Sequence, residues 1–387
     1  MRKNLSKMNF GLLILMILFS AFGLIMIFSA SHATAVERYK MSANHYFIFQ
    51  AFFLLIGYVA GIIILLIPTK FYSKKICKIL LLGGSIGSLL LLKLYGIAAG
   101  GAQSWFNLGI VRLQPTEIIK IAMIIYLAVA YNKVHKKRKV NIWDLVIPLI
   151  PVLICAIIIA TQPDFGGAAI LIFIAILIVL ALPAAKKYRK VFIIVGICGV
   201  LSGVLLIIAL KGNIIQEYQL DRLLNFQKPC ERYTEDSGYQ VCNGYIAIKN
   251  GGLTGVGLDK STQKLMYLPE AHTDFIFPII CEELGLIVGL IIVLLYFIIL
   301  YIILNIAKES ENLRNSIIAY GVFAYLTAHI LINLLGVLGL IPLTGVPLPF
   351  LSYGGSYNIS VLIALFLVQR VNIENKVDKA RRKIKEL

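Results

Sequence analysis

The stretch HTDFIFPIICEELGLIVGLIIVLLYFIILYIIL, residues 272–304, joins a polar start to a long apolar continuation. His272 and Asp274 stand at its beginning, and Glu282 and Glu283 are the charged residues that follow. A helix needs about 20 apolar residues to cross the roughly 30 Å hydrocarbon core of a bilayer, because it must satisfy its backbone hydrogen bonds internally. The run 276–304 meets this requirement and predicts a membrane span.

The composition of the whole chain indicates many such spans. Of its 387 residues, 59% are hydrophobic and 14% are charged, and the mean hydropathy is +0.87. Soluble domains average about 45–50% apolar and about 25% charged residues. The formal charge of +18 comes largely from short basic runs between apolar segments, such as KVHKKRK at 133–139. Such runs orient membrane helices in the bilayer. They therefore indicate a membrane protein rather than one that binds nucleic acid.

Ten apolar segments are expected to cross the membrane. They are residues 9–29, 46–67, 77–95, 117–131, 145–160, 165–183, 191–210, 276–304, 313–338 and 355–370. The apolar run of the first segment is longer than a signal-peptide core, so we expect a span there. Most of the 37 lysines and arginines fall on the N-terminal side of the membrane in this arrangement. The positive-inside rule therefore predicts an all-α polytopic protein of ten spans with both termini in the cytoplasm.

The sequence predicts one membrane domain over residues 1–387, with a large extracytoplasmic loop at 211–275 between the seventh and eighth spans. Residues 371–387 are expected to form a basic cytoplasmic tail. Cys230 and Cys242 flank a polar part of the loop. An extracytoplasmic location would permit a disulfide between them, although their spacing alone does not establish one.

Four stretches expected on the outer side hold unusual residues, and two of them have ordinary explanations. In TQPDFGG, residues 161–167, Asp164 is expected to cap the following helix. The stretch IPLTGVPLPFLSYGGS, residues 341–356, predicts an irregular segment before the last span. Non-helical backbone at membrane depth either lines a cavity or forms a covered, rigid loop.

The third stretch, GGAQSWFNLGIVRLQPTEIIK at residues 100–120, ends in a predicted helix with Gln114 or Thr116 as its cap. Glu117 and Lys120 then stand three residues apart on one helix face. An ion pair inside a membrane is expensive. This pair therefore indicates either a site that lines a cavity or a salt bridge that locks two helices.

The fourth stretch, YLPEAHTDFIF at residues 267–277, crowds Glu270, His272 and Asp274 before the eighth span. Asp274 is expected to cap this span, and helical spacing would place Glu282 on the same side, as an acidic face that descends into the membrane. Burial and like charges raise carboxylate pKa values, which suits a general base. On chemistry alone His272 and Asp274 are comparable candidates for that base, and the acidic face also fits a proton or cation path.

These stretches resemble the SEDS family, the group of bacterial cell-wall polymerases that includes FtsW, RodA and SpoVE. The matching segments, in the family's order, are GAQSWFNLGIVRLQPTEIIK, QPDFGGA, GGLTGVGLDKSTQKLMYLPEAHTDFIFPIICEELG and IPLTGVPLPFLSYGGS. The resemblance covers nearly the whole chain. Three features depart from the family pattern: the cysteine-flanked insertion KPCERYTEDSGYQVCNGY at 228–245, Tyr357 and Asn358 in place of small residues, and Cys281.

The resemblance implies a glycosyltransferase that polymerises lipid II at the outer face of the bacterial cytoplasmic membrane. The 4-hydroxyl of an incoming sugar attacks the anomeric carbon of a glycan held by undecaprenyl pyrophosphate, which leaves with inversion. Asp274 corresponds to the family's proposed general base, and Glu117 and Lys120 match its paired cavity residues. The implied partner is a class B penicillin-binding transpeptidase.

The other site assignments are hypotheses about substrate and metal. A leaving pyrophosphate develops negative charge, so Lys120, Arg222 or a divalent metal should meet it. Asp274 and Glu270 are candidate ligands for Mg²⁺ or Mn²⁺. Further candidates for substrate contacts are Gln114, Glu270 and His272.

Two alternative functions come from other classes. Intramembrane charges such as Glu117, Lys120, Glu282 and Glu283 also mark the substrate paths of transporters, which suggests a lipid II flippase. A non-catalytic scaffold of a cell-wall synthesis complex is the other alternative. The sequence leaves open whether the process is division, elongation or sporulation.

Overall fold

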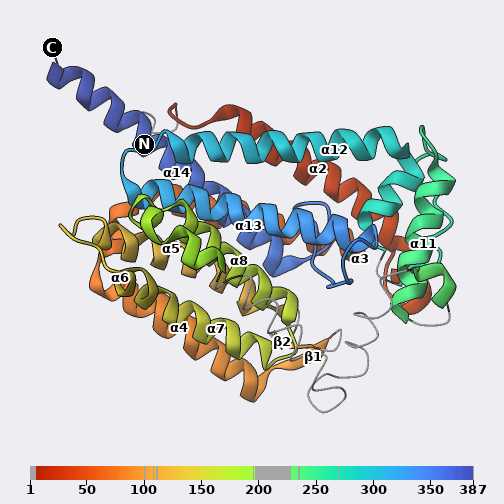
Figure 1. Cartoon of the computed structure of the whole chain (residues 1–387). Helices are drawn as coiled ribbons and strands as arrows, with labels where there is room; N and C mark the ends of the chain where they lie inside the picture. Colours follow the sequence, from red (N-terminus) through yellow and green to blue (C-terminus); the bar gives the residue numbers. More distant parts are fainter. Residues whose placement is uncertain are drawn as a thin grey trace.

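The structure, a computed structural model, describes residues 6–99, 102–107, 109, 112–194, 196, 228–233, 236–269 and 271–386. It is a bundle of long helices that lie side by side (Figure 1). The two chain termini lie near one end of the bundle, and helix α11 lies at the opposite end. This arrangement separates the basic tail from the region that holds the fourth stretch of unusual residues.

The helices of the first half follow the apolar segments of the sequence. They are α2 (Phe10–Ala33) with its π-helical extension η1 (Thr34–Arg38), α3 (His45–Leu66), α4 (Lys75–Tyr95), α5 (Pro115–Val134), α6 (Ile142–Val146), α7 (Ile150–Ala160) and α8 (Phe165–Ala181). Short 3-10 turns adjoin them: η2 (Thr69–Ser73), η3 (Ile147–Leu149) and η4 (Pro183–Tyr188). Local chemistry fixes the start of α2, because the side chain of Asn9 accepts a hydrogen bond from the Leu12 N–H at 3.0 Å.

The second half supplies the centre of the bundle. Its elements are η5 (Pro229–Arg232), α11 (Asp236–Gly251), α12 (Ile276–Lys308), α13 (Leu313–Val337) and α14 (Gly355–Glu386). Helix α13 packs against α5, α8 and α12, while α14 packs mainly along α3. Because α13 and α14 are enclosed by other helices, polar groups on their faces must find partners inside the protein.

Seven of the described helices are long and apolar enough to cross a membrane, and an eighth is added if the bent pair Phe165–Ala181 and Ala185–Ile194 counts as one span. The seven coincide with the expected segments 9–29, 46–67, 77–95, 145–160, 276–304, 313–338 and 355–370. Helices α5 and α8 occupy the expected segments 117–131 and 165–183 without being among the seven. Segment 191–210 lies mostly outside the described residues. The prediction of a helical, polytopic membrane protein is confirmed.

A small antiparallel sheet departs from the all-α prediction. It consists of β1 (Ile97–Ala99), β2 (Ala102–Asn107) and β3 (Arg112–Leu113), in the order β1-β2-β3. The register pairs Ile97 with Trp105 and Phe106 with Leu113. The sheet connects α4 to α5 and brings the chain back to the point where α5 begins.

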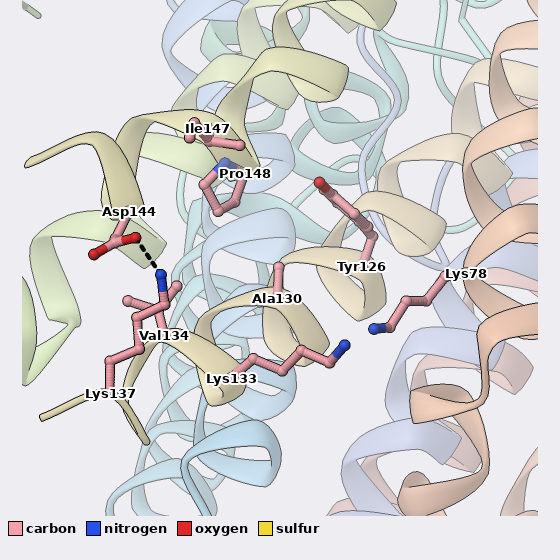
Figure 2. A pocket seen from close by; sticks show the side chains of 9 residues that line it. All are labelled: Lys78, Tyr126, Ala130, Lys133, Val134, Lys137, Asp144, Ile147 and Pro148. Carbon is pink, nitrogen blue, oxygen red and sulfur yellow. Dashed lines mark hydrogen bonds and ion pairs between the residues drawn. The ribbon is translucent and has the colours of Figure 1, made fainter. Parts of the chain in front are cut away.

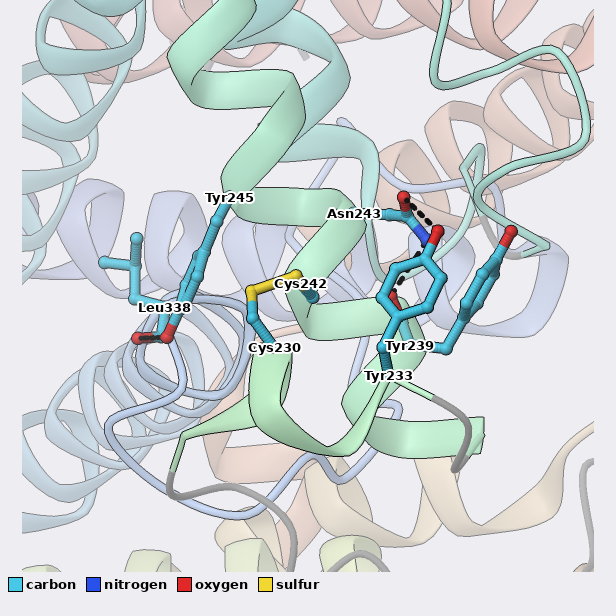
Figure 3. Close-up of a disulfide and its surroundings, with 7 residues drawn as sticks. All are labelled: Cys230, Tyr233, Tyr239, Cys242, Asn243, Tyr245 and Leu338. Atoms are coloured by element: carbon cyan, nitrogen blue, oxygen red, sulfur yellow. Dashed lines mark hydrogen bonds between the residues drawn. A yellow bond between two sulfur atoms is a disulfide. The ribbon is translucent and has the colours of Figure 1, made fainter.

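The disulfide between Cys230 and Cys242 is present, with 5.0 Å between the two Cα atoms. It ties η5 to α11 (Figure 3). Nearly one turn further along α11, the Tyr245 hydroxyl donates a hydrogen bond of 2.9 Å to the carbonyl oxygen of Leu338 (Figure 3). The described part of the large loop is therefore anchored to the end of α13, as expected for a loop that folds against the bundle.

Helix α12 is interrupted at Gly285, where φ is 87° and ψ is 164°. The preceding loop fills the interruption, because the N–H groups of Val256 and Gly257 donate to the carbonyl oxygens of Glu282 at 3.0 Å and Glu283 at 2.9 Å. The N–H of Leu286 donates in return to the carbonyl oxygen of Gly252 at 2.9 Å. The glycine-rich sequence NGGLTGVGL thus serves as a backbone partner for a broken helix.

Replacing Gly285 with alanine should destabilise the protein. A β carbon at this position would lie 2.2 Å from the carbonyl oxygen of Leu253, and the backbone region is nearly exclusive to glycine. We expect Gly285→Ala to lower the free energy of unfolding by about 3 kcal/mol, measured as a lower melting temperature in detergent. Gly84→Ala is the control, since a β carbon there meets nothing within 4 Å. Equal melting temperatures for Gly285→Ala and the wild type would contradict this account of the break.

Candidate functional site

The turn before α12 holds Asp274 against the segment that leads into α14. The side-chain amide of Asn333 on α13 donates to the main-chain oxygens of Asp274 at 2.9 Å and Val346 at 2.8 Å. A β carbon at Gly345 would lie 3.7 Å from Asp274 Oδ2. The hydroxyl of Thr273 donates to Asp274 Oδ1 at 3.0 Å, and Asp274 is 8% exposed. Two sequence stretches some 70 residues apart therefore meet at one carboxylate.

Asp274 does not cap α12, so this expectation is wrong. The helix begins at Ile276, its N-cap residue is Phe275, and no side chain makes a capping hydrogen bond there. The aspartate lies one position too early to reach the first N–H groups of the helix. Its carboxylate is directed at Thr273 and Gly345 instead.

His272 packs as one ring of an aromatic cluster. Its ring centroid lies 4.3 Å from that of Tyr46 and 5.7 Å from that of Tyr353, whose N–H donates to the His272 carbonyl oxygen at 2.8 Å. Burial, with a contribution from the charge of Arg38, lowers the pKa of His272 to about 4. The imidazole is therefore neutral near pH 7. It lies two residues before Asp274 in the chain and packs as an aromatic ring.

The predicted pair of Glu117 and Lys120 forms inside the bundle, with 2.8 Å between Lys120 Nζ and Glu117 Oε1. The two side chains are 5% and 1% exposed. Lys120 Nζ also lies 3.1 Å from Nε2 of His329, and the Tyr325 hydroxyl donates to Glu117 Oε2 at 3.4 Å. The pair therefore joins α5 to α13, as the interpretation of a salt bridge between two helices requires.

One face of α13 connects this pair to Asp274. Tyr325, His329 and Asn333 are spaced by four residues, so they share a face and stand about 6 Å apart along the axis. The first two contact the ion pair and the third holds the main chain of Asp274. None of the three is among the residues predicted from the sequence, although polar residues at helical spacing inside the apolar segment 313–338 are a usable signal.

Several polar atoms along this face are buried without a hydrogen-bond partner among the described residues. They include Asn333 Oδ1 on α13 and the hydroxyl oxygen of Tyr357 on α14, whose ring stacks on His329 with centroids 4.7 Å apart. A buried polar group without a partner is costly unless water or a ligand satisfies it. The interior between Asp274 and the ion pair is thus prepared for polar contacts that the described chain does not itself supply.

The start of α5 is tied to the start of α14. The N–H of Gln114 donates to Ser356 Oγ at 2.9 Å. The Ser356 hydroxyl in turn donates to the carbonyl oxygen of Arg112 at 3.3 Å. Gln114 is the N-cap residue of α5, but its side chain makes no capping hydrogen bond. The Thr116 hydroxyl is buried without a partner in the described chain. The position of the cap is confirmed, and the expected side-chain capping bond is wrong.

Asp164 behaves as predicted and caps α8, since its Oδ1 accepts a hydrogen bond of 2.8 Å from the Gly167 N–H. The acidic face predicted below Asp274 is wrong. Asp274 lies outside the helix, so helical spacing does not relate it to Glu282. Glu282 instead accepts hydrogen bonds from the loop, including the Thr262 hydroxyl at 3.0 Å and the hydroxyl of Ser261.

Glu283 is the centre of a second buried ion pair. It lies 2.9 Å from Lys264 Nζ and accepts from the Ser29 hydroxyl at 2.6 and 2.7 Å. Lys264 also contacts Asp259 at the loop surface. The side chains of Lys264 and Glu283 are 1% and 0% exposed. This cluster fastens the loop to α2 and to the first part of α12, immediately before and after the turn that carries Asp274.

Two predicted site residues, Arg222 and Glu270, lie outside the described residues. Across the part of the chain that the structure describes, no three His, Cys, Asp or Glu side chains are grouped so as to hold a metal ion. The described portion of the site therefore does not form a complete ligand set for a divalent cation.

A family model described as a cell cycle protein, FTSW_RODA_SPOVE, matches residues 10–377. The probable peptidoglycan glycosyltransferase FtsW of Bacillus subtilis (strain 168) is 35% identical over 384 residues, covering 99% of this chain and 95% of the relative. The protein of the same name from Escherichia coli O157:H7 is 31% identical over 385 residues, covering 98% of this chain and 87% of the relative.

Two solved structures share the fold. The Thermus thermophilus rod shape determining protein RodA matches with a TM-score of 0.64 and 23% identity, covering 94% of this chain and 96% of that one. A chain from a peptidoglycan synthase complex, described in terms of the coordination of polymerization and crosslinking, matches with a TM-score of 0.74 and 24% identity. That match covers 95% of this chain and 98% of the other. At this identity the likeness concerns the fold alone.

The buried pair of Lys264 and Glu283 generates a stability prediction. Lys264→Met leaves Glu283 as an unpaired charge inside the protein, which should lower the free energy of unfolding by about 3–5 kcal/mol. Glu283→Gln should cost less, because Lys264 keeps its contact with Asp259. The double variant removes both charges, so it should be less destabilised than the sum of the single variants. Unfolding of the purified protein measures these values.

The exposed pair of Lys228 and Glu231, with side chains 74% and 67% exposed, provides the control. Lys228→Met should change the free energy of unfolding by less than about 1 kcal/mol. Strict additivity of Lys264→Met and Glu283→Gln would mean that the two charges do not support each other, and would contradict the role given to the pair.

Proposed function

Because this chain belongs to the SEDS family of FtsW, RodA and SpoVE proteins, we propose that it is a peptidoglycan glycosyltransferase that polymerises lipid II. The observation that carries the proposal is that one face of α13 contacts the Glu117–Lys120 pair through His329 and the main chain of Asp274 through Asn333. The names of the relatives from Bacillus subtilis and Escherichia coli support the same activity.

The proposal includes the topology. We propose that the protein crosses the bacterial cytoplasmic membrane ten times, with both termini in the cytoplasm and the site at the outer face. The excess of lysine and arginine in the short segments of one side supports this orientation. The position of both termini at one end of the bundle, opposite α11, is consistent with it (Figure 1).

In the proposed reaction, the carboxylate of Asp274 accepts the proton of the 4-hydroxyl on the acceptor sugar. The oxygen forms a bond to the anomeric carbon of the donor as the bond from that carbon to the pyrophosphate oxygen breaks. Undecaprenyl pyrophosphate leaves with the electron pair of that bond, and the configuration at the anomeric carbon inverts. A fixed base at hydrogen-bond distance from the attacking hydroxyl accelerates such a step by about 10²–10⁴-fold.

The Glu117–Lys120 pair is proposed to hold substrate rather than to move the proton. The ammonium of Lys120 supplies positive charge for the pyrophosphate, and Glu117 together with His329 fixes its position. The further substrate contacts that we propose are Gln114, Arg222, Glu270 and His272. A divalent cation, Mg²⁺ or Mn²⁺, held by Asp274 and Glu270 is also a proposal, tested by loss of activity on chelation and its recovery on metal addition.

The proposed partner is a class B penicillin-binding transpeptidase that contacts the outer loop. The likeness to a chain of a peptidoglycan synthase complex supports this partner. Large apolar side chains are exposed on the loop at Leu253, Leu258 and Tyr267. Such exposed apolar side chains could be covered by a partner protein.

A lipid II flippase remains the second candidate, because an intramembrane ion pair such as Glu117 and Lys120 also marks transport paths. The contacts of Glu282 and Glu283 with the loop remove two of the four residues that suggested it. A non-catalytic scaffold is the third candidate. Glycan synthesis from lipid II by purified protein excludes a role as scaffold alone, and movement of labelled lipid II between liposome leaflets identifies a flippase.

Asp274→Asn should abolish glycan synthesis from lipid II, with a loss of at least about 100-fold, because the amide cannot accept the proton. The folded structure should survive, since Asn333 holds the main chain of this residue rather than its carboxylate. Synthesis is measured on gels of labelled glycan strands, and the melting temperature reports folding. Asp164→Asn is the matched control at a helix cap, where full activity is expected. Full activity in Asp274→Asn would remove the carboxylate from the reaction.

A further inference from the structure

A pocket of about 340 Å³ lies far from Asp274, between the beginning of α4, the end of α5 and the α6–η3 turn. The side chains that line it are those of Lys78, Tyr126, Ala130, Lys133, Val134, Lys137, Asp144, Ile147 and Pro148 (Figure 2). It has no part in the reaction proposed above.

The pocket contains positive charge that the described chain does not neutralise. The ammonium groups of Lys78 and Lys133 point toward one another across it (Figure 2). Lys137 is paired with Asp144 at 2.5 Å, and the second carboxylate oxygen of Asp144 accepts from the Asn141 N–H at 3.1 Å. Among the described residues, no carboxylate lies within ion-pair distance of Lys78 or Lys133. Two facing ammonium groups repel each other, so an anion between them would relieve the repulsion.

The rest of the lining suits an amphiphilic anion. Tyr126 also lines the pocket, and its hydroxyl, a hydrogen-bond donor, points away from the two ammonium groups toward the side that holds Pro148 (Figure 2). Ala130, Val134, Ile147 and Pro148 supply apolar wall. Phosphate accepts several hydrogen bonds from lysine and hydroxyl donors, while the glycerol and acyl parts of a lipid need apolar contact.

The position of the pocket identifies the source of the phosphate. Lys78 is near the first residue of α4 and Lys133 near the last residue of α5, so the pocket lies at the end of two membrane helices. This is the end on which the basic runs lie, including 133–139. Basic pockets between helices at the cytoplasmic surface bind lipid head groups. We propose that this pocket binds the phosphate group of an anionic phospholipid from the inner leaflet.

The test measures binding of phosphatidylglycerol and phosphatidylcholine to the full-length protein in detergent by native mass spectrometry. Phosphatidylglycerol should bind the wild type more tightly than phosphatidylcholine does. Loss of one lysine near the membrane surface should weaken binding about fivefold, so Lys78→Gln combined with Lys133→Gln should weaken phosphatidylglycerol binding by roughly 30-fold. Phosphatidylcholine binding should be unchanged. The control is Lys75→Gln combined with Lys136→Gln, an equal charge change at exposed lysines outside the pocket.

Three results would overturn the proposal. The first is unchanged phosphatidylglycerol binding in the Lys78→Gln, Lys133→Gln variant at an unchanged melting temperature. The second is an equal loss in the control variant, because the effect would then belong to diffuse surface charge. The third is displacement of phosphatidylglycerol by millimolar inorganic phosphate or glycerol phosphate, which would identify a soluble phosphate as the ligand. None of these measurements depends on glycosyltransferase activity.

Discussion

The buried ion pair of Glu117 and Lys120 is the interaction on which the arrangement of the site depends. Removing two charges from water costs several kcal/mol per ion, and the cost is offset only when further partners satisfy both groups. His329 and Tyr325 are those partners, so α13 must lie against α5. One turn further along the same face, Asn333 fixes the main chain of Asp274. A single polar face inside an apolar bundle thus sets the distance between the pair and the carboxylate.

The break in α12 is the second constraint. Gly285 allows the chain to leave the helical path, and the loop occupies the interruption with backbone hydrogen bonds and with Lys264. The loop is therefore fixed on both sides of the turn that carries Asp274. This rigid support is what a carboxylate needs if it is to act at a defined position, since displacement of about 1 Å can cost a factor of 100 in rate.

Much of the fold follows from the sequence because bilayer thickness and hydropathy are local properties, and nine of the ten expected segments coincide with described helices. The Asp164 cap was predictable for the same reason. The acidic face was not, because helical periodicity assumes that Asp274 and Glu282 lie in one helix, and α12 begins only at Ile276. The partners of Glu283 are distant in the sequence, Ser29 by 254 residues and Lys264 by 19, so no local pattern indicates them. The sheet at β1–β3 was missed because its strands are short.

The central claim is that the ion pair binds substrate while Asp274 performs chemistry on the same bound molecule. Binding of labelled lipid II to Asp274→Asn protein, with and without the added changes Glu117→Gln and Lys120→Met, separates these roles. The two added changes remove both buried charges together, so neither is left unpaired. We predict that Asp274→Asn binds lipid II as tightly as the wild type and that the triple variant loses most of this affinity. Equal affinity in the triple variant and in Asp274→Asn would contradict the claim that these residues form one site.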